Sequence, residues 1–204
     1  MENKKVIAVF GGSFNPPLNS HFSLAEQIIN EYENIDKVMF VPVNSKYTKL
    51  GLLSNEHRYN MLKLVCDKNA DFILSDIEIT KPIQLPTIET LKLLQKDYPN
   101  HKLAFTIGTD NLKEIETWTK AEELLSNFTI LILERDEDNS EEIINNNDFL
   151  LKYKNSFVKL KENIRSNLSS TFVRDKIKRG KSIRYLTPDE VYYYIRENNL
   201  YENM

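Results

Sequence analysis

The feature of this sequence that most constrains its fold is a run of five apolar residues, Val6 to Phe10, that ends in two glycines. An uninterrupted apolar run of this length is typical of a β-strand buried on both faces of a sheet. After a loop with two prolines, apolar residues return at helical spacing from Phe22 to Tyr32. The pattern therefore predicts a strand, a glycine turn and a helix, in that order.

The same order recurs along the chain, and parallel strands need crossover connections for which helices are the usual solution. The sequence therefore predicts an α/β fold, a doubly wound, Rossmann-like parallel sheet with a small helical C-terminal part. We expect a single domain over residues 1–204, with the core in 1–135 and the C-terminal part in 136–204. Strands are expected over residues 6–10, 37–43, 72–79, 102–107, 128–134 and 157–160, and helices after Ser54, over 87–96, within 111–126, over 170–179 and from Thr187.

Local signals refine two of these segments. Thr187, Pro188 and Glu190 match an N-cap residue, a proline at the first helical position and a capping-box acid. Residues 136–148 are acidic and rich in asparagine, which indicates a solvated loop leading into a surface helix.

Composition excludes several classes of protein. The net charge of -3 argues against a general binder of nucleic acid or of anionic membranes, since both need a dominating basic surface. The single cysteine, Cys66, cannot form an intramolecular disulfide or a zinc cluster. The apolar run before the glycines is too short for a signal peptide or a membrane span. We therefore expect a cytoplasmic protein.

Ligands of open parallel sheets bind outside the carboxyl ends of the strands. After the first strand come Gly11, Gly12, Ser13, Phe14 and Asn15, and then His21 at the start of a helix. Glycines let a phosphate approach the backbone, and a helix N-terminus offers unpaired N–H groups. The segment could be a cradle for nucleotide phosphates or simply a tight turn.

Two motifs give the chain a family resemblance. Residues 11–21 resemble the signature of nucleotidyltransferases that carry a His/Thr-x-Gly-His motif, and residues 168–174 (LSSTFVR) resemble their second signature, Ile-Ser-Ser-Thr-x-x-Arg. Residues 42–58, 108–118 and 180–201 are similar to the nicotinate/nicotinamide mononucleotide adenylyltransferases in particular. The resemblance covers nearly the whole chain and implies a fold of the nucleotidyltransferase type.

Members of that family join ATP to a pyridine mononucleotide and release pyrophosphate, in the biosynthesis of NAD. The reaction is an in-line attack of the mononucleotide phosphate on the α-phosphorus of ATP, which needs positioning and neutralisation of charge rather than covalent catalysis. The resemblance implies His21 and Arg174 as catalytic residues. It implies an ATP site made of Gly11, Gly12, Ser13, Phe14, His21, Gly108, Asp110, Ser169, Ser170, Thr171 and Arg174.

For the mononucleotide, the resemblance implies Lys46 and Lys49 at the phosphate, Trp118 stacked on the pyridine ring, and Arg58 as support for the loop or the phosphate. Thr87 and Thr90 resemble the Thr-x-Asp-Thr-Leu segment of the bacterial nicotinate-type enzymes, where helix N–H groups could accept the nicotinate carboxylate. This favours nicotinate over nicotinamide. With Asn15, these residues complete the predicted mononucleotide site.

The first motif departs from the family pattern at two positions. Leu18 stands where the family has His or Thr, and Ser20 stands at the usual glycine. Leucine cannot donate a hydrogen bond to a phosphate, so we expect a real but slow or substrate-shifted enzyme that a Leu18→His change would speed up. The alternatives are adenylyl or cytidylyl transfer to another phosphorylated acceptor, such as phosphopantetheine, and a catalytically weakened nucleotide-binding homologue.

We expect Mg²⁺ to arrive with ATP and to be held mainly by its phosphates and water. The sequence predicts no metal-binding residues and leaves open whether protein groups also hold the ion. The expected partners are ATP and the pyridine mononucleotide, with no nucleic acid and no membrane, and the sequence leaves homo-oligomer formation open. The charge is also segregated. Residues 151–184 hold eleven Lys or Arg against two acidic residues, which gives this segment a charge of +9 and leaves -12 on the rest of the chain. The basic segment lies on both sides of the second motif.

Overall fold

The computed structural model describes residues 5–32, 34–46, 51–134, 137–160 and 166–202. Its sheet has the strand order β3-β2-β1-β4-β5-β6, and every neighbouring pair is parallel. The order changes direction between β1 and β4, as in the Rossmann arrangement. This confirms the predicted doubly wound sheet, to which β6 is added from beyond residue 135.

The strands are β1 (Val6–Gly12), β2 (Ile35–Pro42), β3 (Phe72–Leu74), β4 (Lys102–Gly108), β5 (Thr129–Leu133) and β6 (Phe157–Lys159). The α-helices are α1 (Asn19–Glu31), α2 (Asn55–Cys66), α3 (Thr87–Asp97), α4 (Thr109–Leu112), α5 (Ala121–Asn127), α6 (Ser140–Asn145), α7 (Asp148–Lys152), α8 (Ser170–Lys178) and α9 (Asp189–Glu197). Short 3₁₀ turns lie at Ile115–Thr117 and Lys154–Ser156.

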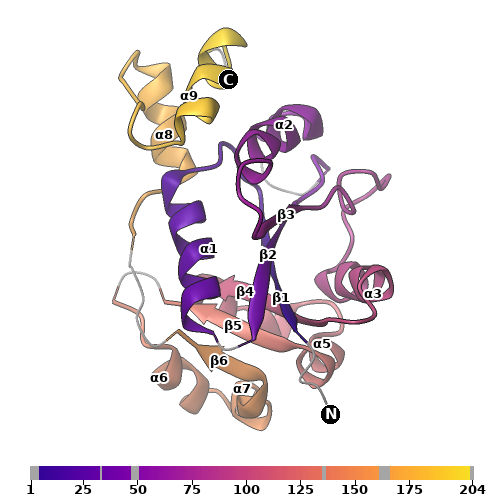
Figure 1. Ribbon diagram of the computed structural model, residues 1–204. Helices are drawn as coiled ribbons and strands as arrows, with labels where there is room; N and C mark the ends of the chain where they lie inside the picture. Colours follow the sequence, from indigo (N-terminus) through magenta and orange to yellow (C-terminus); the bar gives the residue numbers. More distant parts are fainter. Residues whose placement is uncertain (1–4, 33, 47–50, 135–136, 161–165, 203–204) are drawn as a thin grey trace.

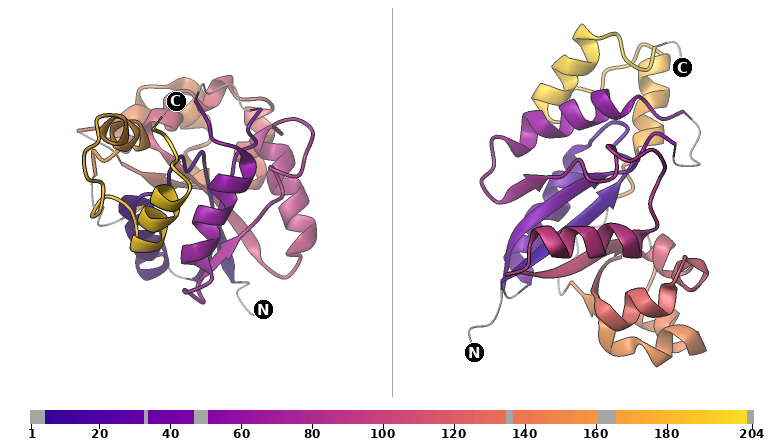
Figure 2. Two further views of the ribbon diagram at one scale, coloured as in Figure 1. Left: turned by 90° about the horizontal axis from the view of Figure 1, so that it is seen from above. Right: turned by 90° about the vertical axis from the view of Figure 1, so that its right-hand side faces the viewer.

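Helices cover both faces of the sheet, as Figures 1 and 2 show. In β1, Ala8 and Phe10 pack in a cluster with side chains of α1 and α2. Ile7 and Val9 point to the other face and pack with side chains of α3, α4 and α5. Successive side chains of a strand alternate between faces, so a strand covered on both sides must be apolar throughout.

The C-terminal helices α8 and α9 lie above the sheet, beside α2 and the beginning of α1 (Figure 1). A third apolar cluster holds them there, with Met61 from α2, Val173 from α8 and Val191 and Ile195 from α9. Leu18, directly before α1, is also fully buried in this cluster. The end of the sheet that binds ligands in such folds is therefore joined to the C-terminal part by hydrophobic packing.

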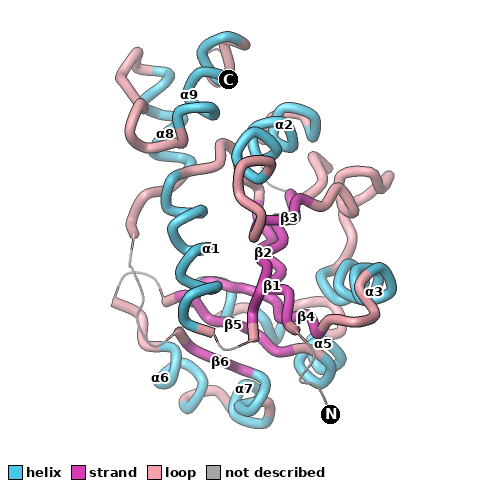
Figure 3. Tube along the Cα trace, viewed as in Figure 1, coloured by secondary structure: helices cyan, strands magenta, loops and turns pink. Residues whose placement is uncertain are grey.

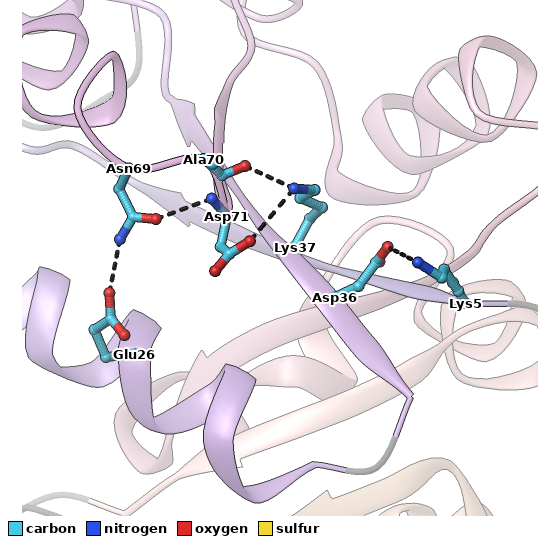
Figure 4. A network of polar contacts seen from close by, with 7 residues as sticks. All are labelled: Lys5, Glu26, Asp36, Lys37, Asn69, Ala70 and Asp71. Atoms are coloured by element: carbon cyan, nitrogen blue, oxygen red, sulfur yellow. Dashed lines mark hydrogen bonds and ion pairs between the residues drawn. The ribbon is translucent and has the colours of Figure 1, made fainter.

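The opposite end of the sheet carries a network of polar contacts (Figure 4). Lys37 of β2 donates to the carbonyl of Ala70 at 2.6 Å and pairs with Asp71 at 3.4 Å. Asn69 joins the same loop to Glu26 of α1 at 2.7 Å. These groups are solvent-exposed, so each pair contributes little to stability, and the network lies at the amino ends of the strands.

The third predicted strand is shorter than expected and ends at Leu74. After Ser75, whose N–H still donates to the carbonyl of Phe40, the backbone forms local turns closed by the carbonyls of Asp76 and Glu78. Ser and Asp favour such turns, and the alternating isoleucines that follow only imitate a strand. The segment up to α3 is therefore mostly loop (Figure 3), and it carries residues of the functional site.

The expectations for two further segments, one helix and one loop, need correction. The helix expected within residues 111–126 is divided into α4, a 3₁₀ turn and α5, with a break at Lys120, whose φ of 55° is left-handed. The loop expected over residues 136–148 contains α6 and leads into α7, because Asn139 and Asn147 cap these helices with their side chains. Asparagine favours N-caps as well as loops.

The N-cap that the sequence predicts at Thr187 lies one residue further along the chain in the structure. Pro188 is the N-cap of α9, and Thr187 is buried with a hydroxyl that has no hydrogen-bond partner among the described residues. Ser54, in contrast, caps α2 with its side chain, as the helix predicted after it requires, and Ser169 caps α8 in the same way. In the part of the chain that the structure describes, no helix combines the length and hydrophobicity that crossing a membrane requires.

The packing of Leu18 gives a prediction of stability. Leu18→Ala should lower the free energy of unfolding by about 2–5 kcal/mol, because it removes a fully buried side chain from the third cluster. Urea unfolding followed by circular dichroism measures this difference. Leu64→Ala is the matched control, since Leu64 is 37% exposed and its truncation should change stability by only about 0.5 kcal/mol. Equal losses in both variants would contradict this account.

Candidate functional site

A cleft of about 660 Å³ opens at the carboxyl ends of the central strands β1 and β4. This is the point where the strand order changes direction, and crevices of open α/β sheets lie there. The loop after β1, the start of α3, the 3₁₀ turn after α4 and the residues that begin α8 all contribute to its wall. The first sequence motif, residues 11–21, and the second, residues 168–174, thus meet in one cavity.

Most of the predicted site residues line this cleft: Gly11, Gly12, Ser13, Phe14, His21, Thr87, Thr90, Asp110, Trp118, Ser169, Ser170 and Thr171. Gly108 lies beside it as the last residue of β4. Asn15, Lys46, Arg58 and Arg174 are not part of the wall. Lys49 lies outside the described residues. The predicted segments therefore meet at one cleft, while the side chains of Asn15, Lys46, Arg58 and Arg174 make contacts outside its wall.

The loop after β1 presents bare backbone to the cleft. A Cβ atom on Gly12 would lie 3.0 Å from the ring of Phe14, and one on Gly11 would lie 3.3 Å from Phe105. Phe14 has a φ of 44°, a left-handed conformation that is strained for a bulky residue. Its buried ring packs edge-on against Phe10 and Phe40. Glycine is thus required where this ring is close to the backbone.

His21 is oriented by its own helix. Its Nδ1 accepts a hydrogen bond from the backbone N–H of Leu18 at 2.9 Å, and its ring packs edge-on against Phe14 at 5.2 Å. When Nδ1 accepts, the proton of the neutral imidazole is on Nε2. His21 lines the cleft with a fixed ring whose second nitrogen is a hydrogen-bond donor.

Leu18 does not face the cleft. Its side chain is buried in the third cluster, while its backbone N–H orients His21. The hydrophobic residue at this position therefore joins α1 to the C-terminal helices. A histidine here would place an imidazole in an apolar cluster, so the expectation that Leu18→His speeds the reaction is replaced by an expected loss of stability.

The second motif binds the first motif. Ser170 donates from its hydroxyl to the carbonyl of Pro16 at 2.9 Å, and the guanidinium of Arg174 donates to the carbonyl of Asn15 at 2.9 Å and to the hydroxyl of Thr171 at 3.1 Å. In this structure, Arg174 therefore holds the loop after β1 instead of facing the cleft.

Asn15 is fully buried, and its side chain connects the loop after β1 to two distant segments. Its amide group donates to the carbonyl of Gly51 and accepts from the N–H of Leu53, at 2.8 and 3.2 Å. The hydroxyl of Tyr201 also donates to this side chain, at 3.0 Å. Burial raises the pKa of Tyr201 well above its ordinary value, so this hydroxyl keeps its proton and remains a donor. Asn15 thus shapes the loop and makes no direct contact with the cleft.

Arg58 is likewise fully buried, on α2. Its guanidinium donates to the carbonyls of Leu53, Ser13 and Val43 at 3.1, 2.9 and 2.6 Å, and to the side chain of Asn55 at 2.7 Å. Burial lowers its pKa, but an arginine remains charged in proteins. The structure places Arg58 as the support of the loops after β1 and β2, one of the two roles that the sequence suggested for it.

Lys46 belongs to the loop after β2. Its ammonium group donates to the carbonyl of Pro82 at 2.6 Å, and its backbone N–H donates to the side chain of Asn44 at 2.9 Å. Asn44 is buried, and its amide donates to the carbonyls of Glu78 and Lys81. The loop that carries Lys46 is therefore joined to the segment before α3.

The first turn of α3 forms another part of the wall. Its N-cap is Pro86, which offers no side-chain acceptor, and the N–H groups of Thr87 and Ile88 donate no hydrogen bond within the described part of the chain. Such groups, together with the helix dipole, favour an anion. Thr90 lies one turn further on and is nearly buried. Trp118, which packs edge-on against Phe105, also lines the cleft.

Sequence reasoning missed Glu78, a carboxylate in the wall that is only 7% exposed. It accepts hydrogen bonds from the hydroxyl of Thr90 and the amide of Gln84, both at 2.7 Å. Burial raises its pKa above the ordinary value of a glutamate. Glu78 was overlooked because it lies in the segment interpreted as the end of a strand.

The charge of the wall is negative. Among the described residues that line the cleft, Glu78, Asp110 and Glu114 are acidic, and none is a lysine or an arginine. The described residues contain no group of three or more His, Cys, Asp or Glu that could hold a metal ion. A polyphosphate in this cleft would therefore depend on backbone N–H groups, helix N-termini and a cation that it brings with it.

Comparisons with known proteins agree with the motifs. A sequence model of the cytidylyltransferase-like family matches residues 9–176. The chain is 33% identical over 199 residues to a probable nicotinate-nucleotide adenylyltransferase of Clostridium botulinum (strain Okra / Type B1), covering 96% of this chain and 98% of the relative. It is also 33% identical over 196 residues to a protein of the same description from Carboxydothermus hydrogenoformans, covering 96% and 97%.

Solved structures show the same fold. The nicotinic acid mononucleotide adenylyltransferase of Plasmodium falciparum, complexed with NaAD, superposes with a TM-score of 0.78 at 23% identity and covers 97% of this chain and 98% of its own. A putative nicotinate-nucleotide adenylyltransferase from Vibrio parahaemolyticus gives a TM-score of 0.69 at 23% identity, covering 98% and 97%.

The contacts of Arg58 predict that it is a major source of stability. Arg58→Ala removes a fully buried guanidinium and leaves three partly buried carbonyls without their donor, and we expect a loss of at least about 3 kcal/mol in the free energy of unfolding. Chemical denaturation measures it. Arg196→Ala, on the exposed part of α9, is the control and should change stability by about 0.5 kcal/mol or less. A loss below about 1 kcal/mol for Arg58→Ala would contradict the assigned role.

The raised pKa of Glu78 predicts a pH dependence of stability. Folding disfavours the charged form, so the native protein loses stability as the pH rises from the ordinary glutamate pKa through the raised one. Glu78→Gln stays neutral, and its stability relative to the natural protein should therefore increase over that range and then level off. Thermal unfolding of both proteins from pH 4 to 9 measures the difference, and a constant difference would show that burial does not perturb this carboxyl.

Proposed function

The chain belongs to the cytidylyltransferase-like family and, within it, to the nicotinate-nucleotide adenylyltransferases, and from this membership we propose that it joins ATP and nicotinate mononucleotide. The products are deamido-NAD and pyrophosphate, in NAD biosynthesis. The observation that carries this proposal is the single cleft in which the glycine loop, His21, the start of α8, the start of α3 and Trp118 meet. The glycine loop and the start of α8 form one side of the cleft, with groups suited to phosphates. The start of α3 and Trp118 form another side, with groups suited to an anionic aromatic ring.

The ATP part of the proposal rests on the loop after β1 and the start of α8. Gly11 and Gly12 allow phosphate oxygens to approach the backbone, and Ser169 to Thr171 place the N-terminus of α8 in the same cavity. Asp110, at the start of α4, is suited to the hydroxyls of the adenosine ribose, beside Gly108. Lys46 and Lys49 remain our candidates for the mononucleotide phosphate.

The pyridine part rests on Trp118 and α3. An indole face stacks well on a flat heterocycle, and the N–H groups of Thr87 and Ile88 can accept a carboxylate. A neutral amide gains less from a helix N-terminus than a carboxylate does. This difference supports nicotinate mononucleotide as the preferred substrate, with nicotinamide mononucleotide as a second one.

The proposed chemistry needs only positioning and charge stabilisation. A phosphate oxygen of the mononucleotide attacks the α-phosphorus of ATP in line, and the bond from that phosphorus to the oxygen bridging the α- and β-phosphates breaks. The bridging oxygen leaves with pyrophosphate. The Nε2 proton of His21 stabilises the negative charge on the phosphates as this bond breaks. Arg174 and Asn15 act indirectly, because they hold the loop in place.

Magnesium fits this site as a companion of ATP. The acidic wall repels a polyphosphate, and Mg²⁺ neutralises phosphate charge when it is bound. The described residues provide no cluster of carboxylates for a resident ion. We propose that the ion is held by ATP and water, that the only substrates are small molecules, and that the enzyme works in the cytoplasm.

The experiment that tests the proposal measures pyrophosphate release with ATP, Mg²⁺ and one acceptor at a time: nicotinate mononucleotide, nicotinamide mononucleotide or phosphopantetheine. We expect turnover with nicotinate mononucleotide. Turnover with phosphopantetheine alone would assign the protein to another acceptor. Binding of a pyridine mononucleotide without turnover would identify a catalytically weakened homologue.

His21→Ala should lower kcat/KM about 10²–10³-fold, which is the usual effect of removing one donor that stabilises charge in a transition state. The pyrophosphate assay measures it. His101→Ala is the matched control, because His101 lies between α3 and β4 and does not line the cleft. An unchanged kcat/KM in His21→Ala would remove His21 from the mechanism.

A further inference from the structure

The wall of the cleft contains a carboxylate where an acidic ligand is expected. Glu78 is held by two neutral donors, Thr90 and Gln84, and forms no ion pair among the described residues. The orientation of Gln84 is fixed by the backbone N–H of Asn44, which donates to its Oε1 at 2.7 Å. Its Nε2 must therefore face Glu78. Two donors aimed at two oxygens suit an ionised carboxylate, which can only accept.

This carboxylate is close to the start of α3. Thr90 is one helical turn beyond Thr87, and side chains on a helix lean toward its N-terminus, over the preceding turn. Because Glu78 is hydrogen-bonded to Thr90, its charge lies roughly one turn, about 5–6 Å, from the N–H groups of Thr87 and Ile88. Glu78, Thr87 and Thr90 all line the cleft.

We infer that Glu78 is a specificity-determining residue that reduces the preference for nicotinate over nicotinamide mononucleotide. This inference rests on the proposed function. The N-terminus of α3 attracts the carboxylate of nicotinate, and the carboxylate of Glu78 repels it. The amide of nicotinamide is neutral, so neither charge acts on it strongly. The balance of the two charges then sets how well the enzyme separates an acid from an amide of nearly the same shape.

Other charges near the start of α3 act differently. Glu89, in the first turn, forms an ion pair with Lys120 at 2.6 Å and does not line the cleft. The ammonium of Lys46 donates to a backbone carbonyl and forms no ion pair with Glu78. Glu78 is therefore the carboxylate that combines burial in the wall, proximity to α3 and the absence of a cationic partner within the described residues.

The decisive measurement is the ratio of kcat/KM for nicotinate mononucleotide to kcat/KM for nicotinamide mononucleotide, in Glu78→Gln and in the natural protein at pH 8.5. Glutamine keeps the shape and removes the charge. Two like charges at this separation change binding enough for the ratio to rise about tenfold in the variant. A merely structural role would lower both values together and leave the ratio unchanged.

Glu89→Gln is the matched control, because it removes a carboxylate from the same helix turn outside the cleft, and its ratio should stay as it is. If Glu78→Gln does not fold, Glu78→Ala serves instead, since water can then meet Thr90 and Gln84, and the same rise is expected. A ratio that is unchanged or lower in the folded variant overturns the inference alone. Absence of turnover with both mononucleotides in the natural protein overturns the proposed function as well.

Discussion

The geometry of the cleft depends on how the loop after β1 is held. This loop has no regular secondary structure, and its shape is fixed by hydrogen bonds from three directions. The side chain of Asn15 binds the segment before α2, its carbonyl accepts from Arg174 of α8, and Tyr201 reaches it from beyond α9. The bond between Tyr201 and Asn15 is buried and the other two are partly buried, which strengthens them and makes the loss of a partner costly.

Hydrophobic packing and this polar network act on the same elements. Leu18 and Met61 join α1 and α2 to the C-terminal helices by apolar contact, while Arg58 joins the loops after β1 and β2 through backbone carbonyls. Packing brings the segments together but is not directional. The hydrogen bonds add direction, so the glycines and His21 face the cleft in a single arrangement.

The parallel, doubly wound sheet and the place of the cleft were predictable, because apolar runs and glycine turns are local signals that repeat along the chain. The sequence offered loop support by Arg58 only as one of two roles, and the contact of Arg174 with the loop after β1 was not predictable from local pattern. Arg58 donates to the backbone carbonyl of Ser13 and Arg174 to that of Asn15, both far away in the sequence. Every residue has such a carbonyl, so the amino-acid sequence does not indicate which one an arginine will bind. Leu18 shows the same limit, since only the fold reveals that its side chain turns away from the cleft.

The hydrogen bond between Asn15 and Tyr201 spans 186 positions of the chain. During synthesis on a ribosome, the first βα unit emerges before Tyr201 and can begin to fold, but this partner of its loop is added only 186 positions after Asn15. The α/β core and the finished phosphate loop therefore mature at different times. A nascent chain that has already formed its parallel sheet would still lack a properly shaped nucleotide site, and full binding capacity would come only after α9 and Tyr201 dock.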